Sequence, residues 1–191
     1  MKTILVLVGS LRENSFNGIF ARALEKLSAH CFRFVYADIG SLPHYNEDLW
    51  SNPPEAVTAF KQQIEAADGV LFVTPEYFRA PPGILINALA WGGRPYGSNS
   101  WAGKPTAVVG TSPGTIGTAA SQSHLRSILP GLEVFLMGQP EVYFHTKPGL
   151  IDAQDEVTDD QTRAFLSGWV ERFDAYVRLI DGARQHAVAA E

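Results

Sequence analysis

Short, nearly uninterrupted apolar runs alternate along this chain with segments in which apolar residues recur at helical spacing. Most of the runs are too apolar for strands with one solvated face, so they predict strands that helices cover on both sides. The expected strands are residues 3–9, 32–36, 69–74, 106–111 and 133–137. The helical spacing predicts helices over residues 17–28, 55–67, 82–91, 117–129 and 158–180.

Strands that alternate with helices predict a parallel, doubly wound α/β sheet. The chain has 191 residues, of which 46% are hydrophobic, and a domain of this size buries roughly 70% of the surface of its unfolded chain. We therefore expect one domain over residues 1–184, with a core that needs no disulfide or metal for stability. The last residues, 185–191, are expected to be frayed.

Composition excludes several classes of protein. The chain has one cysteine, Cys31, which excludes an internal disulfide and a thiolate metal cage and favours a reducing, cytoplasmic location. The apolar run at residues 4–8 is too short for a signal peptide or a membrane span. A net charge of −5 argues against nucleic-acid binding, and the spacing of His44, His124 and His145 fits no zinc site. We expect no metal, membrane or nucleic-acid partner.

The turn after the first expected strand carries the groups that bind phosphate. Ser10, Arg12, Ser15 and Asn17 gather there around the start of a helix, where backbone N–H groups and the helix dipole favour an anion. Arg12 adds a planar fork of donors that can grip a phosphomonoester. The alternative is that Ser15 or Asn17 only caps the helix. The turn contains neither a dinucleotide-binding glycine pattern nor a Walker loop.

Two further loops follow strands of the same sheet, and ligands of open α/β sheets bind at the carboxyl ends of strands. In residues 74–83, prolines fix the path, Tyr77 and Phe78 offer apolar surface to a planar ring, and Glu76 is either a general base or, as we prefer, a structural or ring-adjacent residue. The alternative is a structural turn whose aromatic residues complete the core. Residues 111–118 are small enough for close backbone approach to a ligand, or they simply lead into a helix.

These loops and the segment between the second and third loops contain recognisable motifs. They are Gly9-Ser10-Leu11-Arg12 with Ser15 and Asn17, then Pro75-Glu76-Tyr77, Pro82-Gly83, Asn87-Ala88, Trp91, residues 93–97, Trp101, residues 103–106 and residues 112–114. From about residue 3 to residue 145 the chain resembles the NADPH-dependent FMN reductase family, above all its bacterial quinone and chromate reductases. The resemblance implies a flavodoxin-like three-layer sandwich with a five-stranded parallel sheet in the order 2-1-3-4-5.

The resemblance also implies noncovalently bound FMN, NADPH or NADH as electron donor, and a small-molecule acceptor such as a quinone. Donor and acceptor would use the same ring face in turn, which gives ping-pong kinetics. A homodimer or homotetramer is implied, in which the neighbouring subunit helps to wall the flavin site. Because flavin carries the chemistry, we name no catalytic side chain. The expected cofactor-binding residues are Ser10, Leu11, Arg12, Ser15, Phe16, Asn17, Pro75, Glu76, Tyr77, Phe78, Ser112 and Gly114.

The chain departs from the family pattern at several positions. Phe78 stands where the family usually has Asn, and Thr118 and Ala120 stand where it often has Gly and Arg; Ile86 and Ala90 replace a lysine and an acidic residue. Two other functions therefore stay open. One is an electron-transfer flavodoxin, against which Arg12 weighs, and the other is a flavin-free scaffold on the same fold. Trp91, Trp101 and Tyr96 belong either to the core or to a subunit interface.

Overall fold

The structure is a computed structural model that describes the backbone of residues 1–189 and the side chains of residues 1–184. The strands are β1 (Lys2–Val8), β2 (Phe32–Tyr36), β3 (Gly69–Val73), β4 (Pro105–Ser112), β5 (Phe135–Leu136) and β6 (Val142–His145). The helices are α1 (Phe16–Ser28), α2 (Glu55–Ala66), α3 (Gly83–Gly93), α4 (Ala119–Ile128) and α5 (Asp160–Ala189), with short 3-10 helices η1 (Glu47–Ser51) and η2 (Leu129–Leu132).

All strand pairs of the sheet are parallel, and the order is β2-β1-β3-β4-β5. This order confirms the predicted flavodoxin-like arrangement. The register places β1, β3 and β4 side by side in the centre, with Val8 beside Val73 and Val73 beside Val109. The loops that follow these three strands therefore meet at one end of the sheet.

The outer edge of β4 differs from the prediction. The expected strand at residues 133–137 is reduced to the two residues of β5, which pair with Pro105 and Thr106, and the unpredicted β6 pairs with residues 109–112. Glu133 has a left-handed backbone (φ 61°), so it cannot continue a strand. Pro140 has no N–H to give a sheet ladder, so β4 changes its neighbour from β5 to β6 along its length.

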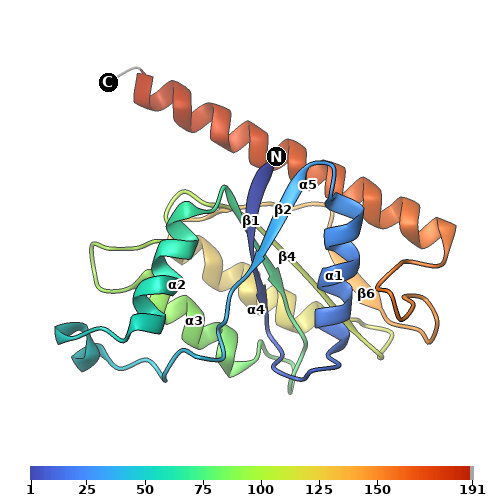
Figure 1. Ribbon diagram of the computed structural model, residues 1–191, viewed down its shortest axis with the longest axis horizontal. Helices are drawn as coiled ribbons and strands as arrows, with labels where there is room; N and C mark the ends of the chain where they lie inside the picture. Colours follow the sequence, from blue (N-terminus) through green and yellow to red (C-terminus); the bar gives the residue numbers. More distant parts are fainter. Residues whose placement is uncertain (190–191) are drawn as a thin grey trace.

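Helices cover both faces of the sheet, as the apolar strands predicted. One buried cluster joins Ile4 and Val6 to α1 and α5, and a second joins Leu5 and Leu7 to α2, α3 and α4. Alternate residues of β1 thus enter opposite cores, which explains its uninterrupted apolar run. In Figure 1, α2 and α3 lie on one side of the strands and α1 lies on the other.

The aromatic residues left open by the sequence divide between core and surface. Trp91 and Trp101 are fully buried in the cluster with α2 and α3, whereas Tyr96 is exposed. Core packing is therefore the correct interpretation for both tryptophans. At the end of the chain, α5 continues to Ala189, past its predicted end at residue 180, because no proline interrupts the segment. The frayed tail predicted for residues 185–191 lies outside the residues that the structure fully describes.

Candidate functional site

A hollow of about 200 Å³ lies where the loops after β1, β3 and β4 meet. It brings together all the predicted cofactor-binding residues except Leu11, Phe78 and Gly114. Two of its lining residues, Thr111 and Pro113, belong to the predicted third loop but were not among the predicted cofactor-binding residues. Thr111 had a signal of its own, since it is a polar residue at the end of an otherwise apolar strand. The lining residues are Ser10, Arg12, Ser15, Phe16, Asn17, Pro75, Glu76, Tyr77, Thr111, Ser112 and Pro113.

The first turn of α1 faces this hollow. Ser15 is the N-cap of α1, and its Oγ accepts a hydrogen bond from the Gly18 N–H at 3.4 Å. The capping interpretation therefore holds for Ser15. Among the described residues, the N–H groups of Phe16 and Asn17 have no acceptor, as expected for the first turn of a helix. They remain available for an anion at the positive end of the helix dipole.

Arg12 and Ser10 stand beside these free N–H groups. Within the described part of the chain, neither side chain makes a hydrogen bond or an ion pair, and Arg12 is exposed. A guanidinium, a hydroxyl and two backbone amides without internal partners thus surround one point. This set of donors fits the terminal phosphate of a mononucleotide.

Asn17, in contrast, is already engaged. Its Nδ2 donates to the Thr111 carbonyl and its Oδ1 accepts from the Thr111 N–H, both at 3.0 Å, and both residues are buried. The amide therefore joins the start of α1 to the end of β4. The backbone N–H of Asn17 stays free for a ligand.

The second loop contains a tight two-residue turn. Tyr77 and Ala80 exchange backbone hydrogen bonds of 3.0 and 2.9 Å, and the two residues between them, Phe78 and Arg79, have φ values of 53° and 67°. Left-handed conformation at both central positions is typical of a type I′ turn. For residues other than glycine it costs roughly 1–2 kcal/mol per residue. Phe78 is fully exposed at the tip of this turn.

Glu76 connects the second loop to α4. Its Oε2 accepts from the N–H groups of Ala120 (3.0 Å) and Ser121 (3.2 Å), and its Oε1 lies 3.5 Å from Arg79 Nη1. Thr118, the N-cap of α4, makes no side-chain capping bond, so the Glu76 carboxylate takes that role. These contacts support the structural role preferred for Glu76, and Ala120 takes part through its backbone.

The third loop is held by its own side chain. Ser112 Oγ donates to the Gly117 carbonyl at 2.7 Å and accepts from the Gly114 N–H at 3.2 Å. Gly114 is exposed and lies outside the lining of the hollow. At Gly117 the φ is +63°, and an added Cβ would lie 2.8 Å from the Tyr143 backbone. Glycine is therefore required where this loop passes β6.

A second hollow of about 460 Å³ adjoins the first and shares Ser10, Arg12 and Tyr77 with it. Its surface is predominantly apolar, and it has room for a planar ring next to the first hollow. An added Cβ on Gly9 would lie 2.8 Å from Leu85 and 2.9 Å from Pro75, so glycine allows the first two loops to approach. The lining residues are Gly9, Ser10, Leu11, Arg12, Tyr77, Pro82, Gly83 and Ile84.

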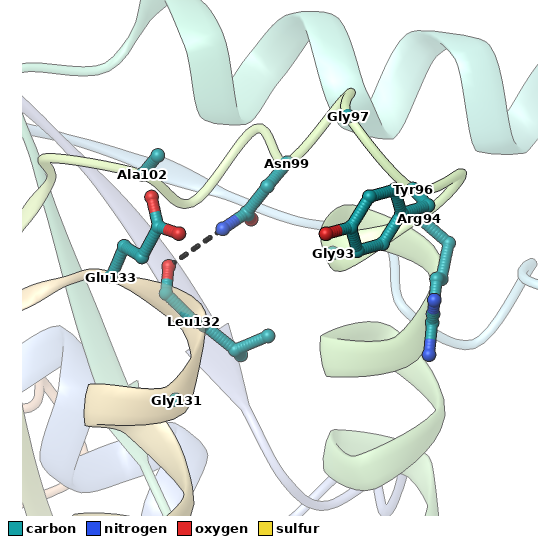
Figure 2. Close-up of a pocket in the computed structure, with 9 residues that line it drawn as sticks. All are labelled: Gly93, Arg94, Tyr96, Gly97, Asn99, Ala102, Gly131, Leu132 and Glu133. Atoms are coloured by element: carbon teal, nitrogen blue, oxygen red, sulfur yellow. Dashed lines mark hydrogen bonds between the residues drawn. The ribbon is translucent and has the colours of Figure 1, made fainter.

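A separate hollow of about 500 Å³ lies at the opposite end of α3, between the loop that follows that helix and η2. Figure 2 shows Arg94 and Tyr96 on one side of it and Leu132 and Glu133 on the other. Asn99 crosses the space with a hydrogen bond to the Leu132 carbonyl at 2.8 Å. An apolar groove formed by Ile86, Leu89, Ala90 and Ile128 continues from its Gly93, Arg94 and Leu132 edge. This part of the surface lies away from the three loops.

The described residues contain no group of three His, Cys, Asp or Glu side chains arranged to hold a metal ion. None of the helices in the same part of the chain has the length and hydropathy needed to cross a membrane.

Comparison with known proteins shows which proteins this chain resembles. A quinone reductase from Pseudomonas putida is 43% identical over 93% of the chain and 95% of its own length. A 2-hydroxy-1,4-benzoquinone reductase from Burkholderia sp. is 49% identical over 92% of the chain and 96% of its own length. The solved structure of FerB, a flavoenzyme NAD(P)H:(acceptor) oxidoreductase from Paracoccus denitrificans, superposes with a TM-score of 0.92 at 45% identity, covering 93% of this chain and 98% of FerB.

The family match covers most of the chain. The NADPH-dependent FMN reductase family matches residues 2–149, which include all three loops of the site. A flavodoxin from Pseudomonas aeruginosa, 20% identical with a TM-score of 0.55, shares the fold alone. The chain therefore belongs to the NADPH-dependent FMN reductase family and is an FMN-dependent NAD(P)H oxidoreductase.

Proposed function

We propose that the three loops hold FMN, with its phosphate at the start of α1 and its ring against Pro75, Glu76 and Tyr77. The observation that carries this assignment is a set of donors that have no partner within residues 1–184: Arg12, Ser10 and the first-turn N–H groups of α1. The charge of the donors matches a phosphomonoester. When bound, FMN supplies a ring that accepts hydride from NADH or NADPH and passes electrons on.

The chain's own residues bind and orient in this scheme. Arg12 and the α1 amides fix the anionic tail, Tyr77 provides apolar surface along both hollows, and the Glu76 carboxylate accepts hydrogen bonds from the start of α4. We infer a quinone as the electron acceptor, which the names of the Burkholderia and Pseudomonas relatives support. Leu11 lines the ring hollow, whereas Gly114 lines neither hollow, and we propose only a backbone contact with FMN for it.

We further infer a homodimer, or a tetramer built from two such dimers, that covers the outer face of α3. This helix is apolar on most sides, and its apolar residues Ile86 and Ala90 are not covered by the rest of the fold: Ile86 is exposed and Ala90 is half-buried. An apolar stripe on the outer face of a surface helix costs solvation free energy unless another surface covers it. The groove of about 290 Å³ between α3 and α4 gives a second copy a place to pack.

The lone, buried Cys31 supports a cytoplasmic location.

The assignment is tested by titrating purified protein with FMN and by adding NADH or NADPH without oxygen. We expect stoichiometric binding and bleaching of the visible flavin absorbance. Arg12→Ala removes a charge-assisted pair worth roughly 1.5–3 kcal/mol, so its Kd for FMN should rise roughly 10- to 100-fold.

Arg172→Ala provides the matched control, because Arg172 is an exposed arginine on α5. Its Kd for FMN should equal that of the unmodified protein. An unchanged Kd in Arg12→Ala would refute the phosphate assignment. Bound flavin that neither nucleotide reduces would instead indicate an electron carrier.

A further inference from the structure

The turn at Phe78 and Arg79 contradicts the local preferences of its sequence. Type I′ turns select Asn, Asp or Gly, because both central residues have positive φ, whereas this chain places phenylalanine and arginine there. Both side chains carry a Cβ that disfavours the left-handed conformation. The turn is nevertheless fixed by the paired hydrogen bonds between Tyr77 and Ala80.

Nothing in the described fold compensates for this cost at Phe78. Its side chain is 103% exposed and so contributes nothing to the core, and its ring takes part in none of the aromatic contacts among the described residues. Arg79 differs, because its guanidinium turns back toward Glu76. A residue whose backbone conformation costs free energy, and whose side chain makes no compensating contact, is expected at a functional position.

The position of Phe78 indicates what it contacts. Tyr77, its neighbour, lines both the phosphate hollow and the adjoining ring hollow. Phe78 lines neither hollow, so the turn presents an exposed phenyl group next to the residue that borders the space assigned to the flavin ring. Such a phenyl group can stack on a second planar ring that approaches the flavin.

We propose that Phe78 is a specificity-determining residue that stacks on planar aromatic acceptors of the quinone class. The proposal rests on the proposed function, because it takes the ring hollow as the flavin site. Acceptors without a planar ring gain nothing from the phenyl face. Phe78 thus favours quinones over compact inorganic acceptors without taking part in electron transfer.

The test compares Phe78→Asn, Phe78→Leu and the control Phe165→Asn, which removes an exposed phenylalanine from α5. Asparagine tolerates positive φ, so Phe78→Asn keeps the turn and should raise Tm by about 2–4 °C as strain is released. The value of kcat/KM for 1,4-naphthoquinone should fall about tenfold in Phe78→Asn, or about 1.4 kcal/mol, and less in Phe78→Leu. The ratio of naphthoquinone to ferricyanide efficiency should therefore fall about tenfold in Phe78→Asn, whereas it should stay unchanged in Phe165→Asn.

Several results would overturn the proposal. An unchanged ratio of naphthoquinone to ferricyanide efficiency in Phe78→Asn would show that the ring does not meet the acceptor. Slower flavin reduction by NADH would assign the residue to the donor, and a smaller assembly by light scattering would assign it to a subunit contact. If the unmodified protein neither binds FMN nor is reduced by NADH, the proposed function fails and the role of Phe78 fails with it.

Discussion

Replacing Asn17 by alanine separates a structural role from a ligand role at the phosphate loop. In the folded protein the Asn17 amide makes two hydrogen bonds to the backbone of Thr111, 94 residues away in sequence. The side chain is 3% exposed and Thr111 is 1% exposed, so water cannot easily replace the lost partner. Asn17→Ala should therefore destabilise the protein even without FMN.

The size of the effect follows from the two groups left behind. The Thr111 N–H loses its acceptor inside the protein, and an unsatisfied buried group costs about 1–3 kcal/mol. The Thr111 carbonyl loses one donor, which adds a smaller amount. We expect a loss of about 2–4 kcal/mol, which is a large part of the ~5–15 kcal/mol that stabilises a typical domain.

Urea unfolding of the apoprotein, followed by circular dichroism, measures this loss. Asn14→Ala is the matched control, because Asn14 lies exposed in the same loop and should change stability by less than about 0.5 kcal/mol. The reasoning is refuted if Asn17→Ala unfolds at the same urea concentration as the unmodified protein while its FMN affinity falls. That result would make Asn17 a direct phosphate ligand.

Two further variants test the other contacts of the fold. Glu76→Gln removes the charge that caps α4 through Ala120 and Ser121 and should lower the free energy of unfolding by about 1–2 kcal/mol; equal stability in urea would contradict this capping role. The hydroxyl and N–H of Thr162 lower the pKa of Asp159 below its ordinary value of 3.8. The ionised Asp159 carboxylate therefore stabilises the folded protein above pH 3.8, and this stabilisation is lost as the pH falls through the folded-state pKa. Asp159→Ala should lower Tm at neutral pH, and the difference should shrink as the pH is lowered below 3.8; a difference that does not change with pH in scanning calorimetry would count against this role of the Thr162 hydrogen bonds.

The central strands were predictable because the signal for each of them lies within its own sequence. The strands β1, β3 and β4 are buried on both faces, so their apolar runs stand out without knowledge of any partner. The edge was not predictable to the same degree. There β5 has only two residues, and β6 forms because the chain returns to β4, which no sequence window reveals.

The site shows the same division. Sequence placed the three loops correctly, since they follow the central strands, but it could not separate free polar groups from engaged ones. Asn17 and Glu76 look like ligands in the sequence, yet their partners lie 94 and 44 residues away. Arg12 has the same appearance, but its side chain has no partner among the described residues. Only the folded arrangement distinguishes these residues, because it depends on contacts distant in sequence.

The side chains that already have hydrogen-bond partners fix the loops that carry the free phosphate-binding donors. The Asn17 clamp joins the first and third loops, Glu76 joins the second loop to α4, and Ser112 holds the third loop to its own end. A phosphate that enters this site meets donors whose backbone is already fixed, so little loop ordering opposes binding. We therefore expect these engaged side chains to contribute to FMN affinity by fixing the positions of Arg12 and the α1 amides.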